Sequence, residues 1–374
     1  MHTFVAALLL AQAPVAVTQH PPAGTGQPNG GFEAVSAACC RGSSHLRRNN
    51  RDDGALAALM RAASVDRSQV GFEKILIGNG DEPPLEGGVW YPAADQPARR
   101  SSPWPGVSEG AQLRGSHLPL IVISHGGGAS YAAHSDTAIA LARAGFVVAA
   151  INHAGDDQTD QSRVVELWRR PRQLTRLVTY MLQEWPEHGK LDSRKVGAFG
   201  FSNGGFTVLV AAGGIPDLTR IGPYCRSHPD HDLCIGIRRA GLDAANLPVH
   251  LPTKPWVGDR RVRAIVVAAP AFGFTFGKRG LASVTVPVQL WRAKNDRHQP
   301  NPYYDEAVRD ALPSPPEYHV VPKAGHFDFL QPCDVQLAKA VPEICTDPNG
   351  FDRGAFHREF NAAVVQFFRS HLRG

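Results

Sequence analysis

Short, almost uninterrupted runs of apolar residues recur along the chain from about residue 118, with helical stretches between them. Strands that are covered on both faces show this pattern, because each face then contacts a helix rather than water. Strands that alternate with helices predict a mostly parallel central sheet with helices on both of its faces. The runs are residues 118–123, 146–151, 196–201, 262–268, 286–291 and 318–321.

Two further strands and two helices are expected from local patterns. Residues 72–77 and 85–91 predict strands joined by a turn rich in Gly and Asn. A helix with one apolar face is expected after Pro171, and another over residues 356–372. Residues 92–117 are rich in Pro, Ser and Gly, which predicts a surface connection.

The 374 residues divide into a leader and one folded domain. Residues 1–68 hold an apolar stretch that resembles part of a secretory signal, although no Lys or Arg precedes it. The rest of this segment is rich in Gly, Pro, Asn and Arg, and we expect a poorly ordered arm with a short helical piece at 55–63. The domain spans 69–374, and residues 214–259 fit no sheet element, so they are expected to form a cap-like insertion.

Charge and cysteine content narrow the partners and the compartment. The formal net charge is only +5, and short Arg pairs such as 169–170 are interpreted as solvated, so no nucleic-acid partner is expected. No apolar run approaches the ~18 residues that a membrane helix needs. The pairs Cys225/Cys234 and Cys333/Cys345 are close in sequence, which predicts disulfides and a secreted or periplasmic protein. A cytoplasmic protein with reduced thiols is the alternative.

Residues 200–204, Gly-Phe-Ser-Asn-Gly, match the Gly-x-Ser-x-Gly nucleophile elbow. In this motif a strand turns sharply into a helix and exposes one Ser hydroxyl, and the two glycines avoid a clash. A second copy occurs at 106–110. Ser202 follows a predicted strand and precedes a helical stretch, whereas Ser108 lies in the expected surface connection. Ser202 is therefore the predicted nucleophile.

Residues 124–128, Ser-His-Gly-Gly-Gly, follow directly on the first apolar run of the sheet. A loop at this position can supply backbone N–H groups that bind the tetrahedral oxygen of acyl transfer. The amides of Gly127 and Asn203 are the predicted oxyanion donors, with Gly126 as a near alternative. His125 is expected to shape the loop rather than act as a base.

The other two members of a catalytic triad are expected downstream, acid before histidine. Asp296 and His326 each follow a predicted strand and are assigned as the orienting acid and the general base. Asp328, Asp305 and His298 are the alternatives for these roles.

Two further clusters contain residue types that could contribute to a site. Phe272, Phe274 and Phe276 follow a predicted strand and would either line an acyl pocket or belong to the core. Residues 228–232 have metal-ligand side chains, but their spacing does not specify a site, and we interpret them as a polar loop between two cysteines. No metal is expected.

From about residue 71 onward the chain resembles the dienelactone-hydrolase-like branch of the α/β-hydrolases. It is also similar to the platelet-activating-factor acetylhydrolase type of serine esterase. The resemblance implies the α/β-hydrolase fold and ester hydrolysis through an acyl-enzyme, without metal or cofactor. Dienelactone hydrolases carry a Cys nucleophile, whereas this chain has Ser202, so dienelactone is not the expected substrate. The matching stretches are residues 87–92, 124–127, 168–172, 200–205 and 324–326.

The sequence thus predicts a serine hydrolase that cleaves small-molecule carboxylic esters. An amidase or peptidase with the same triad is one alternative. A non-catalytic member that binds an apolar ligand is another. No integral membrane segment is expected.

Overall fold

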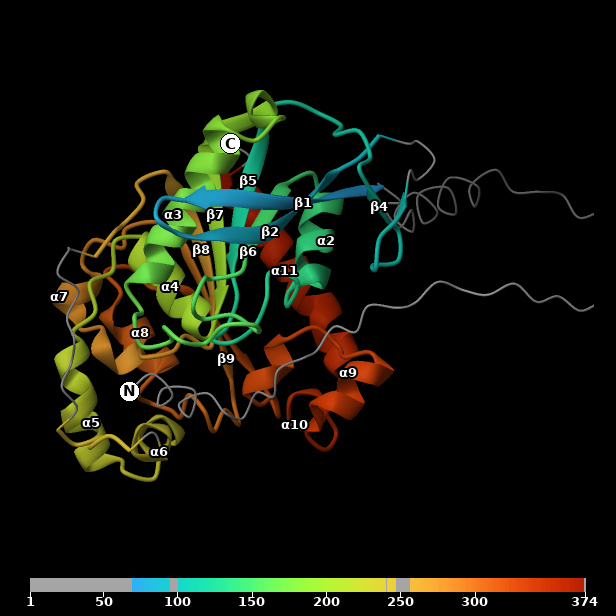
Figure 1. Ribbon diagram of the computed structural model, residues 1–374. Helices are drawn as coiled ribbons and strands as arrows, with labels where there is room; N and C mark the ends of the chain where they lie inside the picture. Colours follow the sequence, from blue (N-terminus) through green and yellow to red (C-terminus); the bar gives the residue numbers. More distant parts are fainter. Residues whose placement is uncertain (1–68, 95–99, 240, 247–255, 373–374) are drawn as a thin grey trace, which may run out of the picture. The chain divides into compact units, whose positions relative to one another are not determined.

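The structure, a computed structural model, describes residues 69–94, 100–239, 241–246 and 256–372. Ten strands in this part of the chain form one sheet in the order β10-β9-β8-β7-β5-β6-β2-β1-β4-β3 (Figure 1). They are β1 (Val70–Asn79), β2 (Glu82–Pro92), β3 (Arg100–Ser101), β4 (Val107–Glu109), β5 (Leu118–Ser124), β6 (Val147–Ile151), β7 (Leu191–Phe201), β8 (Val262–Ala268), β9 (Val288–Ala293) and β10 (Glu317–Val321).

Six neighbouring strands pair in parallel, in the order β6, β5, β7, β8, β9 and β10. β2 pairs antiparallel with β6 at the edge of this group and with β1 on its other side. The helices are α2 (Ser135–Arg143), α3 (Arg169–Gln183), α4 (Asn203–Ala211), α5 (Ile221–Ser227), α6 (Asp232–Arg239), α7 (Lys278–Leu281), α8 (Asp305–Ala311), α9 (Val335–Ala340), α10 (Pro342–Cys345) and α11 (Arg353–Leu372). The predicted α/β class with a mostly parallel sheet is confirmed.

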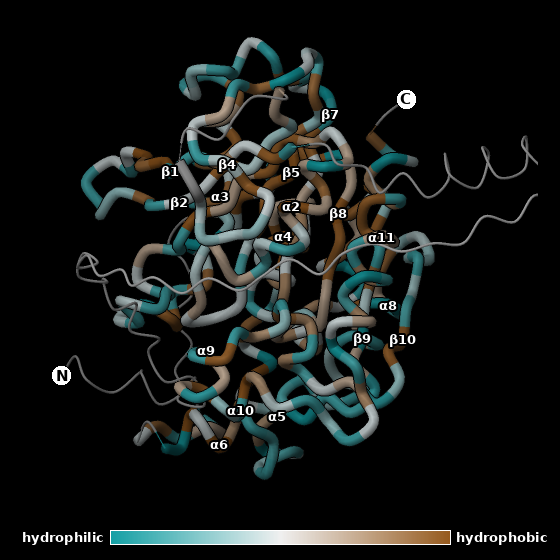
Figure 2. Tube along the Cα trace, turned by 90° about the vertical axis from the view of Figure 1, so that its right-hand side faces the viewer, coloured by the Kyte–Doolittle hydropathy of each residue, from teal (hydrophilic) through white to brown (hydrophobic). Residues whose placement is uncertain are grey.

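The sheet has a hydrophobic core on each face, as the alternation of side chains along β5 illustrates. Leu120 and Val122 belong to one core, which they share with apolar side chains of α3 and α4. Ile121 and Ile123 belong to the other core, with side chains of α2 and α11. Because both faces are covered, the central strands carry apolar residues at nearly every position, and they appear as brown segments in Figure 2.

The register of the central strands determines where functional loops can meet. Ser124 at the end of β5 pairs with Gly200 of β7, and Phe201 pairs with Ala268 of β8. The carboxyl ends of these three strands are therefore level with one another. In open α/β sheets this edge is where ligands bind.

The expectation for residues 92–117 was wrong in part. The segment contains the short strands β3 and β4, and Ser108 lies in β4, where it pairs with Gly71 of β1 and is buried. Trp104 holds this segment against the sheet, because its ring packs on Phe72 and Trp90 with centroid distances of 4.8 and 5.3 Å. The packing of Trp104 thus helps to hold this segment, which looks like a loop in the sequence, at the edge of the sheet.

Both predicted disulfides, Cys225–Cys234 and Cys333–Cys345, are present. The first joins α5 to α6 within the expected cap-like insertion, and the described part of that insertion contains helices but no strand. Two disulfides are typical of an extracellular or periplasmic protein. Of the helices among the described residues, none is both long and apolar enough to cross a membrane. The expected leader and arm lie outside the described residues, as do the other two cysteines.

Candidate active site

Ser202 occupies the sharp turn between β7 and α4. Its backbone has φ 55° and ψ −118°, a strained combination for a residue with a side chain. The turn needs the flanking glycines, since a Cβ on Gly200 would overlap the Gly204 carbonyl, and a Cβ on Gly204 would overlap the Ser124 carbonyl. Two backbone hydrogen bonds hold the turn in place: the Ser202 N–H donates to Ala268 O and Ser202 O accepts from the Ala271 N–H, both at 3.0 Å.

The structure brings the three predicted triad residues into one line of contacts. Nε2 of His326 lies 3.1 Å from Oγ of Ser202, and Nδ1 of His326 lies 2.7 Å from Oδ2 of Asp296. Asp296 follows β9 by three residues, and His326 opens a short 3-10 turn after β10. The other carboxylate oxygen of Asp296 accepts the Gln299 N–H at 2.7 Å. Both side chains of the Asp–His pair are buried.

The alternative acids occupy other environments. Asp328 pairs with Arg353 at 2.9 Å and accepts the Gly325 N–H at 2.7 Å, so it stabilises the loop that carries His326. Asp305 is fully buried at the start of α8, and burial raises the pKa of its carboxyl well above the ordinary value, with the charge of Asp296 adding to the shift. Neither carboxyl is hydrogen-bonded to the His326 ring.

His298, the alternative base, is a neighbour of His326 rather than a substitute for it. The two ring centroids are 5.3 Å apart, and Nδ1 of His298 contacts a carboxylate oxygen of Asp232 at 2.9 Å. Burial lowers the pKa of His298, and the proximity of His326 lowers it further. Asp232 begins α6, so this contact joins the insertion to the loop that follows Asp296.

The glycine-rich loop after β5 lies against the elbow, as the strand register requires. A Cβ on Gly126 would stand 3.1 Å from the Phe201 ring and 3.6 Å from the Ser202 Cβ, which shows how closely the loop approaches Ser202. The Gly128 N–H donates to Asp156 at 2.9 Å and is therefore occupied. Among the described residues, the Gly126 and Gly127 amides donate to no acceptor. Asn203 is the first residue of α4, where backbone N–H groups have no partner within the helix.

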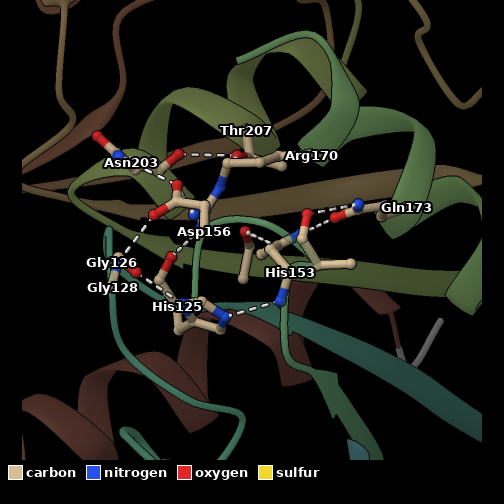
Figure 3. A network of polar contacts seen from close by, with 11 residues as sticks. His125, Gly126, Gly128, His153, Asp156, Arg170, Gln173, Asn203 and Thr207 are labelled. Carbon is tan, nitrogen blue, oxygen red and sulfur yellow. Dashed lines mark hydrogen bonds and ion pairs between the residues drawn. The ribbon is translucent and has the colours of Figure 1, made fainter. Parts of the chain in front are cut away.

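A buried ion pair lies behind this loop, and sequence analysis missed it (Figure 3). Arg170 of α3 contacts Oδ2 of Asp156 through Nη1 at 2.5 Å, and both side chains are almost fully buried. Arg170 also donates to the His125 carbonyl oxygen and, at 3.2 Å, to the hydroxyl of Thr207. The interpretation of the Arg169–Arg170 pair as solvated was wrong for Arg170.

His125 and His153 are buried in the same network, and their contacts fix their tautomers. Nε2 of His125 accepts the His153 N–H at 3.0 Å, so its Nδ1 carries the proton and donates to the Gly126 carbonyl at 2.6 Å. The His153 ring is bound by Ser124 at 2.8 Å and by Gln173 at 2.9 Å. Burial lowers the pKa of both histidines well below the usual value, and the Arg170 charge lowers it further. Both rings are thus neutral, and His125 supports the loop.

The phenylalanines expected at the pocket have different surroundings. Phe272 directly follows the Ala271 amide bound to Ser202, is half-buried, and packs against Phe206 with a centroid distance of 5.8 Å. Phe274 stacks on Tyr224 of α5 at 3.9 Å and therefore contacts the insertion. Phe276 is buried in the core.

The polar loop between Cys225 and Cys234 packs with aromatic rings. His228 and His231 stack at 4.8 Å, and the hydroxyl of Tyr224 contacts Nδ1 of His231 at 2.7 Å. No group of three or more His, Cys, Asp or Glu side chains in the described part of the chain is arranged to hold a metal ion.

Comparisons with known proteins bear on the fold and on one segment of the sequence. The chain has the α/β-hydrolase fold. The solved structures that match it include a ferulic acid esterase from Streptomyces cinnamoneus, with a TM-score of 0.55 and 20% identity over 83% of this chain and 92% of that one. Residues 101–167 match the family model described as platelet-activating factor acetylhydrolase, isoform II, which confirms the resemblance to that branch over this segment. A search of curated proteins finds no match.

Proposed function

We propose that this chain is a carboxylic ester hydrolase that uses Ser202 as nucleophile, His326 as general base and Asp296 as orienting acid. The observation that carries the proposal is the continuous line of contacts from the Ser202 hydroxyl through the His326 ring to the buried Asp296 carboxylate. A carboxylate at Nδ1 keeps the proton on that nitrogen and leaves Nε2 free to accept the serine proton. It also stabilises the imidazolium that forms.

In the first half-reaction, Ser202 Oγ attacks the ester carbonyl carbon while its proton passes to Nε2 of His326. The carbonyl oxygen becomes an oxyanion, and the amides of Asn203 and Gly127 donate to it, with Gly126 as the alternative to Gly127. The positive end of α4 lies at the same place and favours the negative charge. The intermediate then collapses, the alcohol leaves with the proton from His326, and the acyl group stays on Ser202.

In the second half-reaction, water attacks the acyl-enzyme. His326 takes a proton from the water, and a second tetrahedral oxyanion forms at the same amides. When it collapses, the acid is released and His326 returns the proton to Ser202 Oγ, which regenerates the hydroxyl and the neutral base. The reaction includes no redox step, and His326 accepts and returns the proton in each half-reaction. The family match and the esterase neighbour support an ester, rather than another acyl compound, as the substrate.

The substrate proposed is a small, neutral and partly apolar ester. Phe272 lies beside the nucleophile, and Phe274 faces the insertion, so both are proposed to contact the apolar part of the substrate. The insertion over residues 214–259 is proposed to act as the cap of the site. We expect faster turnover of short acyl esters than of anilides, and equal rates would favour an amidase or peptidase.

Export from the cytoplasm is part of the proposal, with the N-terminal segment as its signal. The disulfides within the insertion and beyond the His326 loop support it. Non-reducing peptide mapping of protein from its native compartment should recover both disulfide-linked peptides. Four free thiols there would contradict export.

A fluorophosphonate probe tests the nucleophile directly, because only an activated serine reacts with it. We expect a single adduct that peptide mass spectrometry assigns to Ser202, and no adduct in Ser202→Ala. Ser108→Ala is the matched control, since it alters the second Gly-x-Ser-x-Gly copy, and its labelling should equal that of the unmodified chain. No adduct, or an adduct at Ser108, would refute the assignment. A panel of p-nitrophenyl esters and anilides then tests the preference for esters.

A further inference from the structure

We infer that Arg170 and Asp156 form a positioning device for the oxyanion hole: their buried ion pair holds the glycine-rich loop and the first turn of α4 at a fixed separation. The inference rests on the proposed function, because it concerns the donors of that reaction. Neither residue is proposed to touch the substrate.

The contacts of the pair divide between the two sides of the oxyanion hole. On the loop side, Arg170 donates to the carbonyl oxygen of His125, and Asp156 accepts the Gly128 N–H at 2.9 Å. These two contacts flank the Gly126 and Gly127 amides on either side. The first contact orients the peptide group that carries the Gly126 amide, and the two contacts together hold the peptide groups on either side of the one that carries the Gly127 amide (Figure 3).

On the elbow side, Arg170 Nε donates to Thr207 Oγ1 at 3.2 Å, and that hydroxyl donates to the Asn203 carbonyl oxygen at 2.7 Å. Asn203 also reaches Oδ2 of Asp156 through its side-chain amide at 3.5 Å. Thus the first turn of α4, which supplies the Asn203 amide, is connected to the same ion pair as the loop.

The chemistry of the pair suits this role. A guanidinium has a rigid fork of donors, so Arg170 can hold Asp156, His125 and Thr207 at once, whereas an ammonium would act as a single point charge. The pair has almost no exposure to solvent, with side-chain exposures of 3% and 4%. Replacing a buried ion pair with apolar residues is often neutral or stabilising, so such a pair is weak evidence for a stabilising role. Orientation of donors explains its presence better.

The neutral histidines complete the support. His125 donates to the Gly126 carbonyl from Nδ1, and its other nitrogen is held by the backbone of His153. Arg170 contributes here as well, since its charge lowers the pKa of both rings and favours their neutral form. A protonated His125 would lose the acceptor that binds the His153 N–H.

The test uses the double variant Arg170→Met/Asp156→Asn, which removes both charges together and leaves no unpaired buried ion. Arg169→Met is the matched control, because Arg169 is the adjacent residue of α3 and pairs with Glu166 and Glu82 instead. Active sites are counted by titration with a fluorophosphonate, so that kcat refers to folded, labelled enzyme. A p-nitrophenyl ester is the substrate, and a trifluoromethyl ketone serves as the probe that forms a tetrahedral adduct.

Oxyanion stabilisation acts on the transition state alone, so the double variant should lose about 10- to 100-fold in kcat per titrated site, with KM within about threefold. Inhibition by the trifluoromethyl ketone should weaken by a factor similar to the loss in kcat/KM. Arg169→Met should keep the kcat of the unmodified chain. A purely structural role would instead reduce the number of titratable sites and leave kcat per site unchanged, and that result would overturn the inference.

If the double variant gives no titratable protein, Arg170→Lys carries the same test. It keeps the charge beside Asp156 but loses the fork to His125 and Thr207, so a reduced kcat supports the inference and an unchanged kcat overturns it. If the unmodified chain reacts with the fluorophosphonate and hydrolyses esters, and the variant has the same kcat, only the positioning role is refuted. An unmodified chain that hydrolyses no ester refutes the proposed function, and the positioning role with it.

Discussion

Replacement of Asp296 by Asn tests the assignment of the triad acid, and the surroundings of the side chain determine the result. One carboxylate oxygen accepts the Gln299 N–H at 2.7 Å, and the other faces Nδ1 of His326 at 2.7 Å. In Asp296→Asn the amide oxygen must stay toward Gln299, because an NH2 group there would face another donor. The NH2 group therefore faces Nδ1, which must then act as an acceptor.

The histidine tautomer with its proton on Nε2 cannot accept the Ser202 proton. We expect kcat to fall by about 10⁴, as in other triads, which corresponds to about 5 kcal/mol of transition-state stabilisation. The assay is steady-state hydrolysis of a p-nitrophenyl ester, normalised to folded protein. KM should change little, since the Asp296 side chain is fully buried behind His326.

Two matched Asp→Asn variants serve as controls. Asp305→Asn replaces a buried carboxyl whose pKa is raised well above its ordinary value by burial, so an amide is a close substitute. Asp328→Asn weakens the contact with Arg353 and should lower stability more than turnover per folded site, since Arg353 keeps its contact with Asp347. The reasoning is refuted if Asp296→Asn retains more than about a tenth of normal turnover while Asp328→Asn is inactive.

Three further predictions concern the loop, a disulfide and a buried acid. Gly126→Ala pushes the new Cβ against Phe201 and should lower kcat about 10- to 100-fold with little change in unfolding temperature; normal kcat would mean that the loop position is not critical. Replacing both Cys333 and Cys345 by Ser should cost at most about 3 kcal/mol of unfolding free energy in urea titrations, given a separation of 12 residues. The raised pKa of Asp305 implies that the unfolded chain releases a proton above pH ~3.9 that the folded chain retains, so stability falls with rising pH up to the folded pKa. Relative to Asp305→Asn, the unmodified chain should lose up to about 1.4 kcal/mol per pH unit in that window, and parallel pH profiles would contradict this.

The parts of the fold that follow from local pattern were predictable. Each buried strand needs apolar side chains on both faces, so β5 and β8 appear in the sequence almost at their observed bounds. β7 begins at Leu191, five residues before the predicted start, because Leu191 also pairs with Leu118 of β5, across an irregularity in the register. The polar residues between Leu191 and Val196 give no hydrophobic signal. β4 was missed for a related reason, since its pairing depends on Trp104 packing against residues distant in sequence.

The candidate site likewise contains residues that a local pattern predicts and residues that only tertiary packing identifies. The elbow glycines are required by the turn itself, so the motif around Ser202 identifies the position locally. Arg170 gives no such signal: it follows Arg169, which meets carboxylates of Glu82 and Glu166, and only tertiary packing distinguishes the buried arginine from its partly exposed neighbour. Asp156 is likewise adjacent to Asp157, whose side chain accepts hydrogen bonds from its own turn. Burial separates Arg170 from Arg169, whereas Asp156 and Asp157 are both buried and differ in their partners, a distant guanidinium for Asp156 and the local turn for Asp157. The sequence alone reports neither burial nor tertiary partners.

The case for an ester hydrolase draws on two sets of residues with no member in common. The family match spans 101–167, which includes the glycine-rich loop and Asp156 but none of the three proposed triad residues. The triad geometry, in contrast, depends on loops after β7, β9 and β10. The register of β5 against β7 brings the two sets together. Arg170, three residues beyond the matched segment, contacts His125 of the glycine-rich loop and Thr207 of α4, the helix that follows Ser202. A buried guanidinium is costly to desolvate, so its place at this junction is best explained if the relative position of loop and elbow matters for the reaction.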